Sequence, residues 1–491
     1  MNQPANLPAS AGKKLPAQAA FLALLRRVHF YIGLFVGPFI FVAALTGTLY
    51  VLTPQFENYL YADALFTSSK GEAQPLSRQI DAALNVTGQD KQIYAVRPAP
   101  SAGETTRVMF SDPHLGASKS RAIFIDPVTL AVKGDMTVYG TSGILPFRTW
   151  LDDLHRGLLL GDAGRVYSEL AASWLWVAAL GGVILWLTSR KSRTPRKVIE
   201  NIEKQQRSRR WHSTLGLILL AGLLFFSATG LTWSQWAGDN IGVLRAYMGW
   251  MTPAVKTNLD PLAEAVPADE HAEHHAQMAD MPDMPEMDMS EHAMPAAPQA
   301  ATVSASAFDA VVQAARESGI EAHKIEIRPA YTTGKAWTVT EVDRSWPTQV
   351  DAVSVDPGSL QIVDHVRFAD FPLLAKLTRW GVDAHMGILF GVWNQAILVI
   401  FGTGLCVMIA WGYRLWWLRR TVSSDGNNPA VTLLQTWKSV PFSLQCPIFV
   451  ITLGLAISLP VMGASLVIFL LIDVFRWQKN RRAVKVVSAV S

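Results

Sequence analysis

The sequence contains very little cysteine. Its two cysteines, Cys406 and Cys446, lie within or beside apolar runs, and neither lies in a polar region. We therefore expect no disulfide between the polar regions, and a cluster held by four thiolates is excluded. The sequence also lacks a Walker A motif and a G-x-G-x-x-G motif that opens a βαβ unit. A nicotinamide-cofactor site within this chain is therefore not expected.

Charge is scarce as well. Only 17% of the residues are charged, against roughly 25% in an average soluble domain. The net charge is +4, and the basic residues cluster beside apolar runs. In that position they indicate membrane topology rather than nucleic-acid binding.

Apolar residues are abundant instead. Half of the residues are hydrophobic, and the 17 tryptophans suit the interface between lipid and water. The pattern predicts a mainly α membrane protein with a bundle of six transmembrane helices. The predicted spans are residues 29–53, 168–188, 212–236 and 392–413, followed by a two-helix hairpin at 441–477.

Flanking charges predict the orientation of these helices. The first run is longer than a signal peptide core and lacks a cleavage site, so it is expected to remain as an anchor. Basic residues precede this run, fill the loop 189–211 and follow the last helix. Both termini and this loop are therefore expected to be cytoplasmic. Residues 1–20 are polar and predict a disordered tail, and Pro38 is expected to kink the first helix.

Two polar regions, residues 56–147 and 240–370, lie on the outer side in this topology. Each combines a helical period with short alternating stretches, which predicts two small extracytoplasmic α+β domains. An Asp-Pro pair begins 29 residues before His155 in one region, and another begins 29 residues before His385 in the other.

The membrane segments repeat as well. Around His29 and His212 the sequence has Arg at −3, Gly at +4, Thr at +17 and Gly at +18. The stretch HRGLLLG from His155 likewise aligns with HMGILFG from His385. These matched positions predict duplicated helix pairs, with the last two helices outside the repeat.

The predicted topology places His29 and His212 near the cytoplasmic face, and His155 and His385 near the outer face. Neutral imidazole is a good axial ligand for haem iron, and histidines from facing helices can hold one haem between them. We therefore predict two bis-histidine b-type haems, and the lack of a C-x-x-C-H motif excludes c-type attachment. The alternative pairing, His29 with His155 and His212 with His385, requires equal depths, which the charge topology disfavours.

Two other sets of residues near these histidines have more than one interpretation. Four arginines are candidate partners of the haem propionates, although topology alone also explains them. They are Arg26, Arg27, Arg209 and Arg210. Four glycines either admit a flat macrocycle between helices or simply permit close helix packing. They are Gly33, Gly37, Gly216 and Gly222.

An insert at residues 271–294 is rich in histidine and methionine, with acidic residues between them. Thioethers favour Cu(I), and imidazole binds copper and zinc. The composition predicts an extracytoplasmic loop that collects copper or zinc, and a linker that drifted to this composition is the alternative. The candidate ligands are His271, His274, His275, His292, Met278, Met281, Met284 and Met287.

Several motifs together carry a family resemblance over about residues 20–420. They are RRVHFYIGLFVGPF from Arg26, LHRGLLLGDAGR from Leu154, SELAAS from Ser168, RRWHSTLG from Arg209, and DAHMGILFG from Asp383 with Gly412-Tyr413-Arg414. The chain resembles the PepSY-associated transmembrane family of bacterial inner-membrane proteins. That family includes PiuB-like iron-uptake proteins and haem-containing ferrisiderophore reductases.

The resemblance implies that the outer domains are PepSY-like, a fold linked in other proteins to peptidase inhibition. It also implies a haem-dependent reductase in the bacterial inner membrane that passes electrons to a ferric siderophore or another metal chelate. The donor would be membrane quinol or a cytoplasmic reductase. The His/Met-rich insert departs from the family pattern and leaves open whether the metal is iron or copper.

Two other functions are consistent with the sequence. In one, the chain is a non-haem protein that handles or transports copper or zinc, and the membrane histidines form a relay. In the other, it is a PepSY-type regulator that holds a protease at the membrane.

Overall fold

The computed structural model of the chain describes residues 16–116, 118–140, 143–189, 200–260, 303–420 and 433–490. They form many helices and one antiparallel sheet. The chain divides into two compact units. The first comprises Met1–Leu45, Leu160–Asn240 and Phe401–Ser491, and the second comprises Thr46–Leu159 and Ile241–Ile400. The insert at 271–294 and most of the predicted tail at 1–20 lie outside the described residues.

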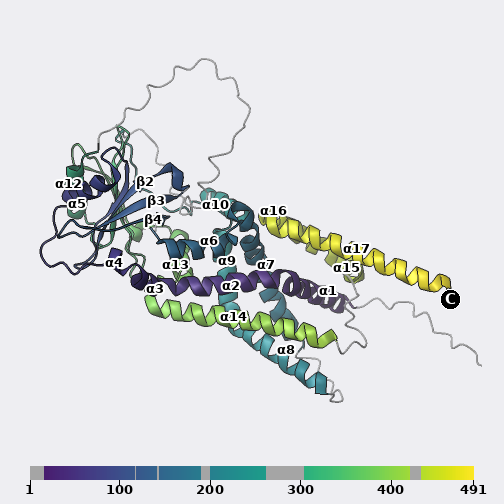
Figure 1. The fold of residues 1–491 in the computed structure, drawn as a ribbon. Coiled ribbons are helices and arrows are strands. Elements are labelled where there is room, and N and C mark those ends of the chain that lie inside the picture. The colour runs from purple at the N-terminus through teal and green to yellow at the C-terminus, as the bar shows by residue number, and fades with distance from the viewer. Residues whose placement is uncertain are drawn as a thin grey trace, which may run out of the picture. The chain divides into compact units, whose positions relative to one another are not determined.

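Long apolar helices make up the first unit and extend into the second (Figure 1). They are α1 (Ala17–Tyr31), η1 (Ile32–Val36), α2 (Gly37–Val51), α7 (Gly161–Ser189), α8 (Glu200–Ile218), α9 (Leu220–Thr232), α10 (Trp236–Tyr247) and α14 (Gly391–Arg420). The C-terminal part adds α15 (Leu433–Ser439), α16 (Phe442–Ser458) and α17 (Pro460–Val490).

Four helices in the described ranges are long and apolar enough to cross a membrane, and a fifth span results if α8 and α9 are counted together. Helix α16 has 17 residues, which span about 26 Å, less than the roughly 30 Å of a hydrocarbon core. The six-helix count therefore stays a prediction.

Several helix starts differ from the sequence prediction. Helix α1 begins at Ala17, inside the predicted tail, and α8 begins at Glu200, inside the predicted loop 189–211. Strong helix formers such as Ala, Leu, Arg, Lys and Gln dominate both extensions, and they allow the helix to continue. His29 and His212 consequently lie within helices rather than at their first turns.

The predicted single span at 212–236 is broken. Helices α8 and α9 meet at Leu219 with a bend of 60°. Gly216 and Gly222 flank the break, and glycine lowers the cost of such a kink. A Cβ at Gly222 would lie only 2.2 Å from Phe401 of α14, so the close approach there requires glycine.

The first helix contains a π-helical turn near Pro38, and α1, η1 and α2 together form one span from Ala17 to Val51. The π-helical turn η1 lies directly before Gly37 and Pro38. Proline cannot donate to the carbonyl four residues earlier, which belongs to Leu34. The Tyr413 hydroxyl of α14 donates to that carbonyl at 2.9 Å.

The C-terminal helices pack on α1 within the first unit. Asp473 of α17 is fully buried and accepts a hydrogen bond from Tyr31 Oη at 2.5 Å and another from Leu434 N at 2.9 Å. One carboxylate therefore joins α1, the start of α15 and α17. Tyr31 lies two residues after His29, so this contact fixes the helix that carries the histidine.

The second unit contains one eight-stranded antiparallel sheet, with the strand order β4-β3-β2-β1-β5-β6-β7-β8. Its first half has β1 (Ile93–Arg97), β2 (Thr106–Ser111), β3 (Lys119–Ile125) and β4 (Val132–Tyr139). Its second half has β5 (Ile325–Arg328), β6 (Trp337–Glu341), β7 (Ala352–Val355) and β8 (Ile362–Val366). The predicted domains at 56–147 and 240–370 are therefore the two halves of one sheet, joined where Val96 pairs with Ile327.

Short helices complete this unit. They are α3 (Thr53–Leu60), α4 (Ala62–Leu65), α5 (Leu76–Thr87), η2 (Pro113–Leu115), α6 (Pro146–Gly157), α12 (Ala305–Glu317), η4 (Phe368–Asp370) and α13 (Leu373–His385). Each half thus runs from a helix through four strands to a further helix that carries a histidine: α5 to α6 in the first half, and α12 to α13 in the second.

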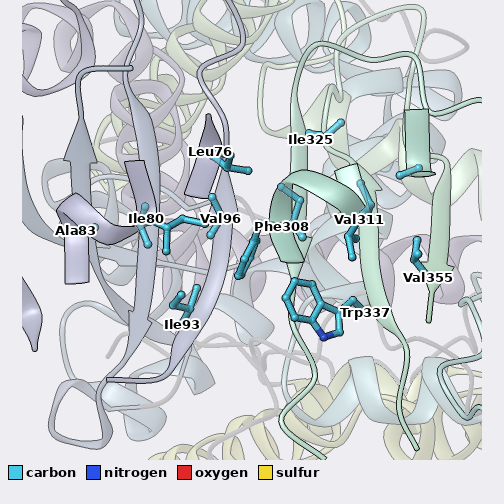
Figure 2. Close-up of a cluster of buried hydrophobic side chains, with 14 of the residues drawn as sticks. Leu76, Ile80, Ala83, Ile93, Val96, Phe308, Val311, Ile325, Trp337 and Val355 are labelled. Atoms are coloured by element: carbon cyan, nitrogen blue, oxygen red, sulfur yellow. The ribbon is translucent and has the colours of Figure 1, made fainter. Parts of the chain in front are cut away.

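Helices α5 and α12 pack against each other and share one hydrophobic core with strands from both halves (Figure 2). Ile80, Phe308 and Val96 are fully buried there. Asp309 of α12 also accepts hydrogen bonds from Leu76 N at 2.7 Å and Ser77 N at 3.1 Å, which caps the start of α5. Because these contacts cross the midline, the two halves fold as one body.

The two Asp-Pro turns have the same form. Asp126 N bonds to Ala131 O, and Leu130 at φ 63° returns its N–H to Asp126 O. Asp356 N bonds to Gln361 O, and Leu360 at φ 59° does the same. Leucine rarely adopts positive φ, so both turns share an unusual conformation.

The Tyr413 contact yields a prediction for the first unit. Tyr413→Phe is expected to destabilise the chain by about 1 kcal/mol, because the Leu34 carbonyl loses its donor. Pro38→Ala supplies a backbone N–H for that carbonyl, so Tyr413→Phe should cost much less in that background. Thermal unfolding in detergent of the wild type, the two single variants and the double variant measures how far the two substitutions depend on each other. Equal effects of Tyr413→Phe with and without Pro38→Ala would contradict the prediction.

A second prediction concerns the junction between the sheet halves. Glu326 of β5 bonds to Arg97 of β1 at 2.6 Å, with side chains 6% and 13% exposed. Desolvation opposes ionisation of Glu326, but Arg97 and Arg328 outweigh it, so the pKa lies below its usual 4.5. The stability that ionised Glu326 contributes is fully present above the pKa of this carboxyl in the unfolded chain. It is lost as the pH falls through the lower pKa of the carboxyl in the folded chain.

Glu326→Gln is therefore expected to cost roughly 3 kcal/mol at pH 7, since it leaves a buried guanidinium without its carboxylate. The variant should also lose less stability than the wild type when the pH falls below about 4. Asp135→Asn is the control, because its pair with Arg121 is exposed and should contribute less than about 1 kcal/mol. Thermal unfolding across pH distinguishes these outcomes.

Candidate functional site

Four histidines form two pairs, and each pair lies within one unit. In the first unit, the rings of His29 from α1 and His212 from α8 have centroids 6.3 Å apart and planes at 76°. In the second unit, the charge of His155 on α6 lowers the pKa of His385 on α13. The haem-ligand pairing expected from the sequence stays a prediction.

His212 is held by the backbone of the facing helix. Its Nδ1 lies 3.0 Å from the carbonyl oxygen of Met408 on α14. A carbonyl only accepts, so Nδ1 carries the proton in this contact and Nε2 keeps its lone pair in the neutral ring. A histidine that donates its other ring N–H to a carbonyl is the usual arrangement around a metal ligand.

His155 is held by a side chain. Its Nδ1 lies 3.0 Å from Thr46 Oγ1 on α2. Thr46 is buried and occupies the +17 position of the sequence repeat after His29. The threonine at this repeated position therefore contacts a histidine, and that histidine belongs to the second pair and not to the pair of His29.

His385 is the last residue of α13 and is partly buried. Desolvation by burial, together with the charge of His155, lowers the pKa of His385 to about 3. The imidazole is therefore neutral at physiological pH, which is the form that binds a metal.

Glycines line three of these rings. A Cβ at Gly182 of α7 would lie 3.3 Å from His29 Cε1, and a Cβ at Gly412 of α14 would lie 3.4 Å from His212 Cε1. A Cβ at Gly47 of α2 would lie 3.2 Å from His155 Cε1. The histidine rings therefore rest against backbone that has no side chain.

The four glycines that the sequence suggested as neighbours of a macrocycle do not lie against the histidine rings. A Cβ at Gly33 would have open space, and Cβ atoms at Gly37 and Gly216 would meet Tyr413 and Met408. Gly222 accommodates Phe401. Sequence reasoning missed Gly182, although the pair Gly181-Gly182 within an apolar helix was a visible signal.

The four candidate arginines lie one turn before the histidines of the first pair. Arg26, Arg209 and Arg210 are exposed, whereas Arg27 is partly buried and interacts with Asp473 and Arg476. The metal-ligand candidates of the insert, from His271 to His292, lie outside the described residues.

The second pair lies beside tight turns. Helix α6 ends at Gly157, and Leu158 and Leu159 both have positive φ before α7 begins at Gly161. Helix α13 ends at His385, Gly387 has positive φ, and α14 begins at Gly391, which also has positive φ. The histidines therefore lie on separate helices ahead of α7 and α14, and these two helices begin at Gly161 and Gly391, before the predicted residues 168 and 392.

A model of the PepSY-associated TM region matches residues 26–419. The chain belongs to this family. The match includes all four histidines and ends before α15, so the C-terminal helices that hold α1 lie beyond it. No curated protein matches the chain.

Membership in the PepSY-associated transmembrane family and the apolar helices establish a membrane protein. Among the described residues, no group of three or more His, Cys, Asp or Glu side chains could hold a metal ion.

The glycine contacts yield a prediction for the site. Gly182→Val is expected to destabilise the chain by about 1–3 kcal/mol, because the added atoms force the His29 ring out of its position. Gly33→Val is the control, since a Cβ there meets nothing within 4 Å. Thermal unfolding compares the two, and equal losses of stability would contradict the packing account.

Proposed function

We propose that the chain is a di-haem electron-transfer protein of the bacterial inner membrane that reduces extracytoplasmic ferric complexes. One observation carries this proposal, namely the separation of 6.3 Å between the His29 and His212 rings. Imidazole nitrogens bind transition metals at about 2.0–2.1 Å, so two rings on opposite sides of one ion have centroids about 6 Å apart. The spacing therefore suits one axial pair.

The residues around each pair fit a haem. His212 donates Nδ1–H to Met408 O, and Thr46 holds Nδ1 of His155, so both rings have a fixed orientation. Glycines at positions 47, 182 and 412 keep the facing helices close to the rings. Bound haem would supply a one-electron Fe(III)/Fe(II) couple whose potential depends on these axial ligands and their hydrogen bonds.

The proposed path uses both pairs in sequence. With the termini cytoplasmic, electrons from quinol or a cytoplasmic reductase reach the His29–His212 pair first. They leave through the His155–His385 pair on the side of the sheet domain. A duplicated helix pair accounts for both sites, since each repeat contributes one histidine to each pair.

The reaction transfers one electron to each ferric ion. The donor loses one electron for each Fe(III) that becomes Fe(II), so a quinol, which gives up two electrons and two protons, would reduce two ferric ions. Hard oxygen donors hold Fe(III) more strongly than Fe(II), so reduction loosens a ferric siderophore. Because the electron moves without a bond being made at the chelate, no general acid or base is needed there. A copper or zinc role for the insert remains a separate prediction.

Haem analysis of the purified chain tests the proposal. The wild type is expected to hold two low-spin b-type haems. His29→Ala or His212→Ala should remove one of them, and His155→Ala or His385→Ala should remove the other. Pyridine haemochrome assays and reduced-minus-oxidised spectra measure both quantities.

His114→Ala is the control, because His114 lies exposed in η2 of the sheet domain and should leave both haems in place. A colourless wild-type protein purified from haem-replete cells would contradict the proposal. Full function of all four His→Ala variants would favour a protease regulator, and bound copper or zinc without haem would favour metal transport.

A further inference from the structure

Helix α13 lies at the surface of the second unit, and its exposed side is apolar. The side that it buries is formed by Ala375, Val382 and Asp383. At 100° per residue, the opposite side is formed by Leu373, Leu374 and Leu377. Leu373 is 64% exposed and Leu377 is 50% exposed. A surface helix in water normally turns polar residues outward and leucines inward, so α13 has the reverse arrangement on its outward side.

The charged side chains of α13 do not cover these leucines. Lys376 and Arg379 fall on the flank that adjoins the buried side. The ammonium of Lys376 donates to Ala369 O at 2.6 Å, and the guanidinium of Arg379 pairs with Asp383 at 3.4 Å. Both charges are thus directed toward the unit itself, and the leucines remain outward.

Helix α12 of the same unit shows the ordinary pattern. It buries Phe308, Val311 and Ala315. Its exposed residues are all polar, namely Ser306, Gln313, Arg316 and Glu317. The unit therefore places polar side chains outward where a helix meets water, and the leucines of α13 indicate a different environment.

Aromatic rings extend the leucine side of α13 toward the start of α14. Trp380 falls on the same side as Leu373 and Leu377. Its ring centroid lies 5.7 Å from that of Trp346, which in turn lies 6.1 Å from that of Phe390. Trp346 and Phe390 are more than half exposed. We call this continuous set the α13 apolar surface; it consists of Leu373, Leu374, Leu377, Trp380, Trp346 and Phe390.

The α13 apolar surface runs directly into a membrane span. Helix α14 begins at Gly391, the residue after Phe390, and Gly391–Leu418 is long and apolar enough to cross a membrane. Trp346 is tied to this start, because its backbone N–H donates to Leu389 O at 2.7 Å. Tryptophan is enriched at the level where a span enters the membrane. Lipid that surrounds the start of α14 is therefore the neighbour best placed to cover this surface.

We propose that the α13 apolar surface is inserted into the membrane surface at which α14 begins, so that α13 is an interfacial amphipathic helix. Such a helix lies in the plane of the interface and buries its apolar side by about 5–10 Å. Gly387 and Gly391, both with positive φ, form the turn that separates its direction from that of the span. Because His385 is the last residue of α13, the insertion also sets the depth of this histidine. The proposal concerns lipid alone and does not depend on haem binding.

Spin labels in the full-length chain test this insertion. Cys406→Ala and Cys446→Ser remove the two native thiols, and Leu373→Cys or Leu377→Cys then receives a nitroxide. The labelled chain is reconstituted into bilayers of phosphatidylethanolamine and phosphatidylglycerol. EPR measures collisions with oxygen, which concentrates in lipid, and with a polar nickel chelate, which stays in water.

The ratio of oxygen collisions to nickel-chelate collisions should be about tenfold higher at Leu373→Cys and Leu377→Cys than at Gln313→Cys, because a polar solute is excluded from lipid. Gln313→Cys is the water reference, since Gln313 is exposed on α12 of the same unit. Ile397→Cys is the lipid reference, since Ile397 is exposed on α14 within the span. The two leucine positions should match Ile397→Cys.

Two other outcomes would overturn the proposal. Collisions with the nickel chelate as frequent as at Gln313→Cys would show that the leucines face water. Few collisions with either reagent would show that protein covers the surface, either a second copy of the chain or another partner. Because the references lie in the same unit, their expected ratios also show that the labelled chains are folded.

Discussion

The close contact between a histidine ring and a glycine on the facing helix is the constraint on which the candidate site depends. His29, His155 and His212 each rest against a glycine Cα at a spacing where an added Cβ would lie 3.2–3.4 Å away. A ring held this way has little rotational freedom, because backbone cannot move aside as a side chain can. The packing of these helices therefore also fixes the orientation of the imidazole rings.

The helix that carries His29 is fixed from two sides within the first unit. On one side, Tyr413 satisfies the carbonyl that Pro38 leaves free, so the π-turn that follows His29 remains in the structure. On the other side, Asp473 accepts from Tyr31 and caps α15. The second contact comes from helices beyond the family match at 26–419. The histidine therefore lies within the family region, and one of the contacts that fix its helix lies outside that region.

Sequence patterns predicted the elements better than their assembly. Alternation predicted strands in both polar regions but did not predict β8, and matched offsets drew attention to His29, His212, His155 and His385. Pairing of β1 with β5 joins segments more than 200 residues apart, and no local period records such a partner. The break at Leu219 depends on the approach of Phe401 to Gly222, which is likewise a tertiary contact. Helix starts were misjudged because helix formers continue past the apolar run.

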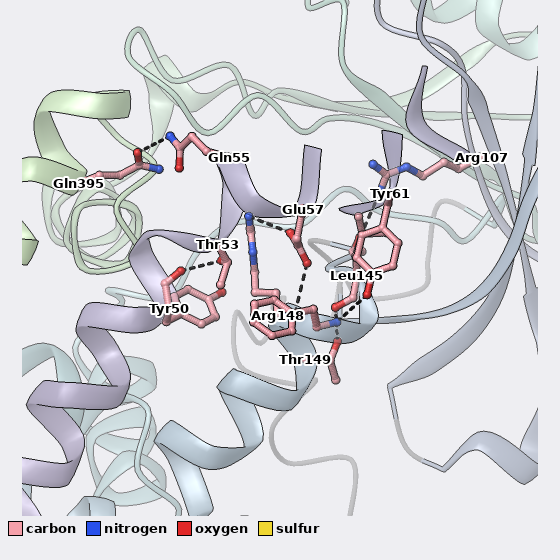
Figure 3. A network of polar contacts seen from close by, with 12 residues as sticks. Tyr50, Thr53, Gln55, Glu57, Tyr61, Arg107, Leu145, Arg148, Thr149 and Gln395 are labelled. Carbon is pink, nitrogen blue, oxygen red and sulfur yellow. Dashed lines mark hydrogen bonds and ion pairs between the residues drawn. The ribbon is translucent and has the colours of Figure 1, made fainter. Parts of the chain in front are cut away.

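Polar side chains between Thr46 and Glu57 link the sheet to the second histidine pair. Glu57 accepts from Arg148 of α6 and lies within the electrostatic range of Arg107 on β2, while Tyr61 holds the start of α6 through Phe147 N (Figure 3). Helix α6 therefore cannot shift without disturbing contacts to the sheet. Since α6 carries His155, these contacts also help to fix the orientation of that histidine. This coupling gives the sheet domain a physical role in the candidate site that does not require the sheet to bind anything itself.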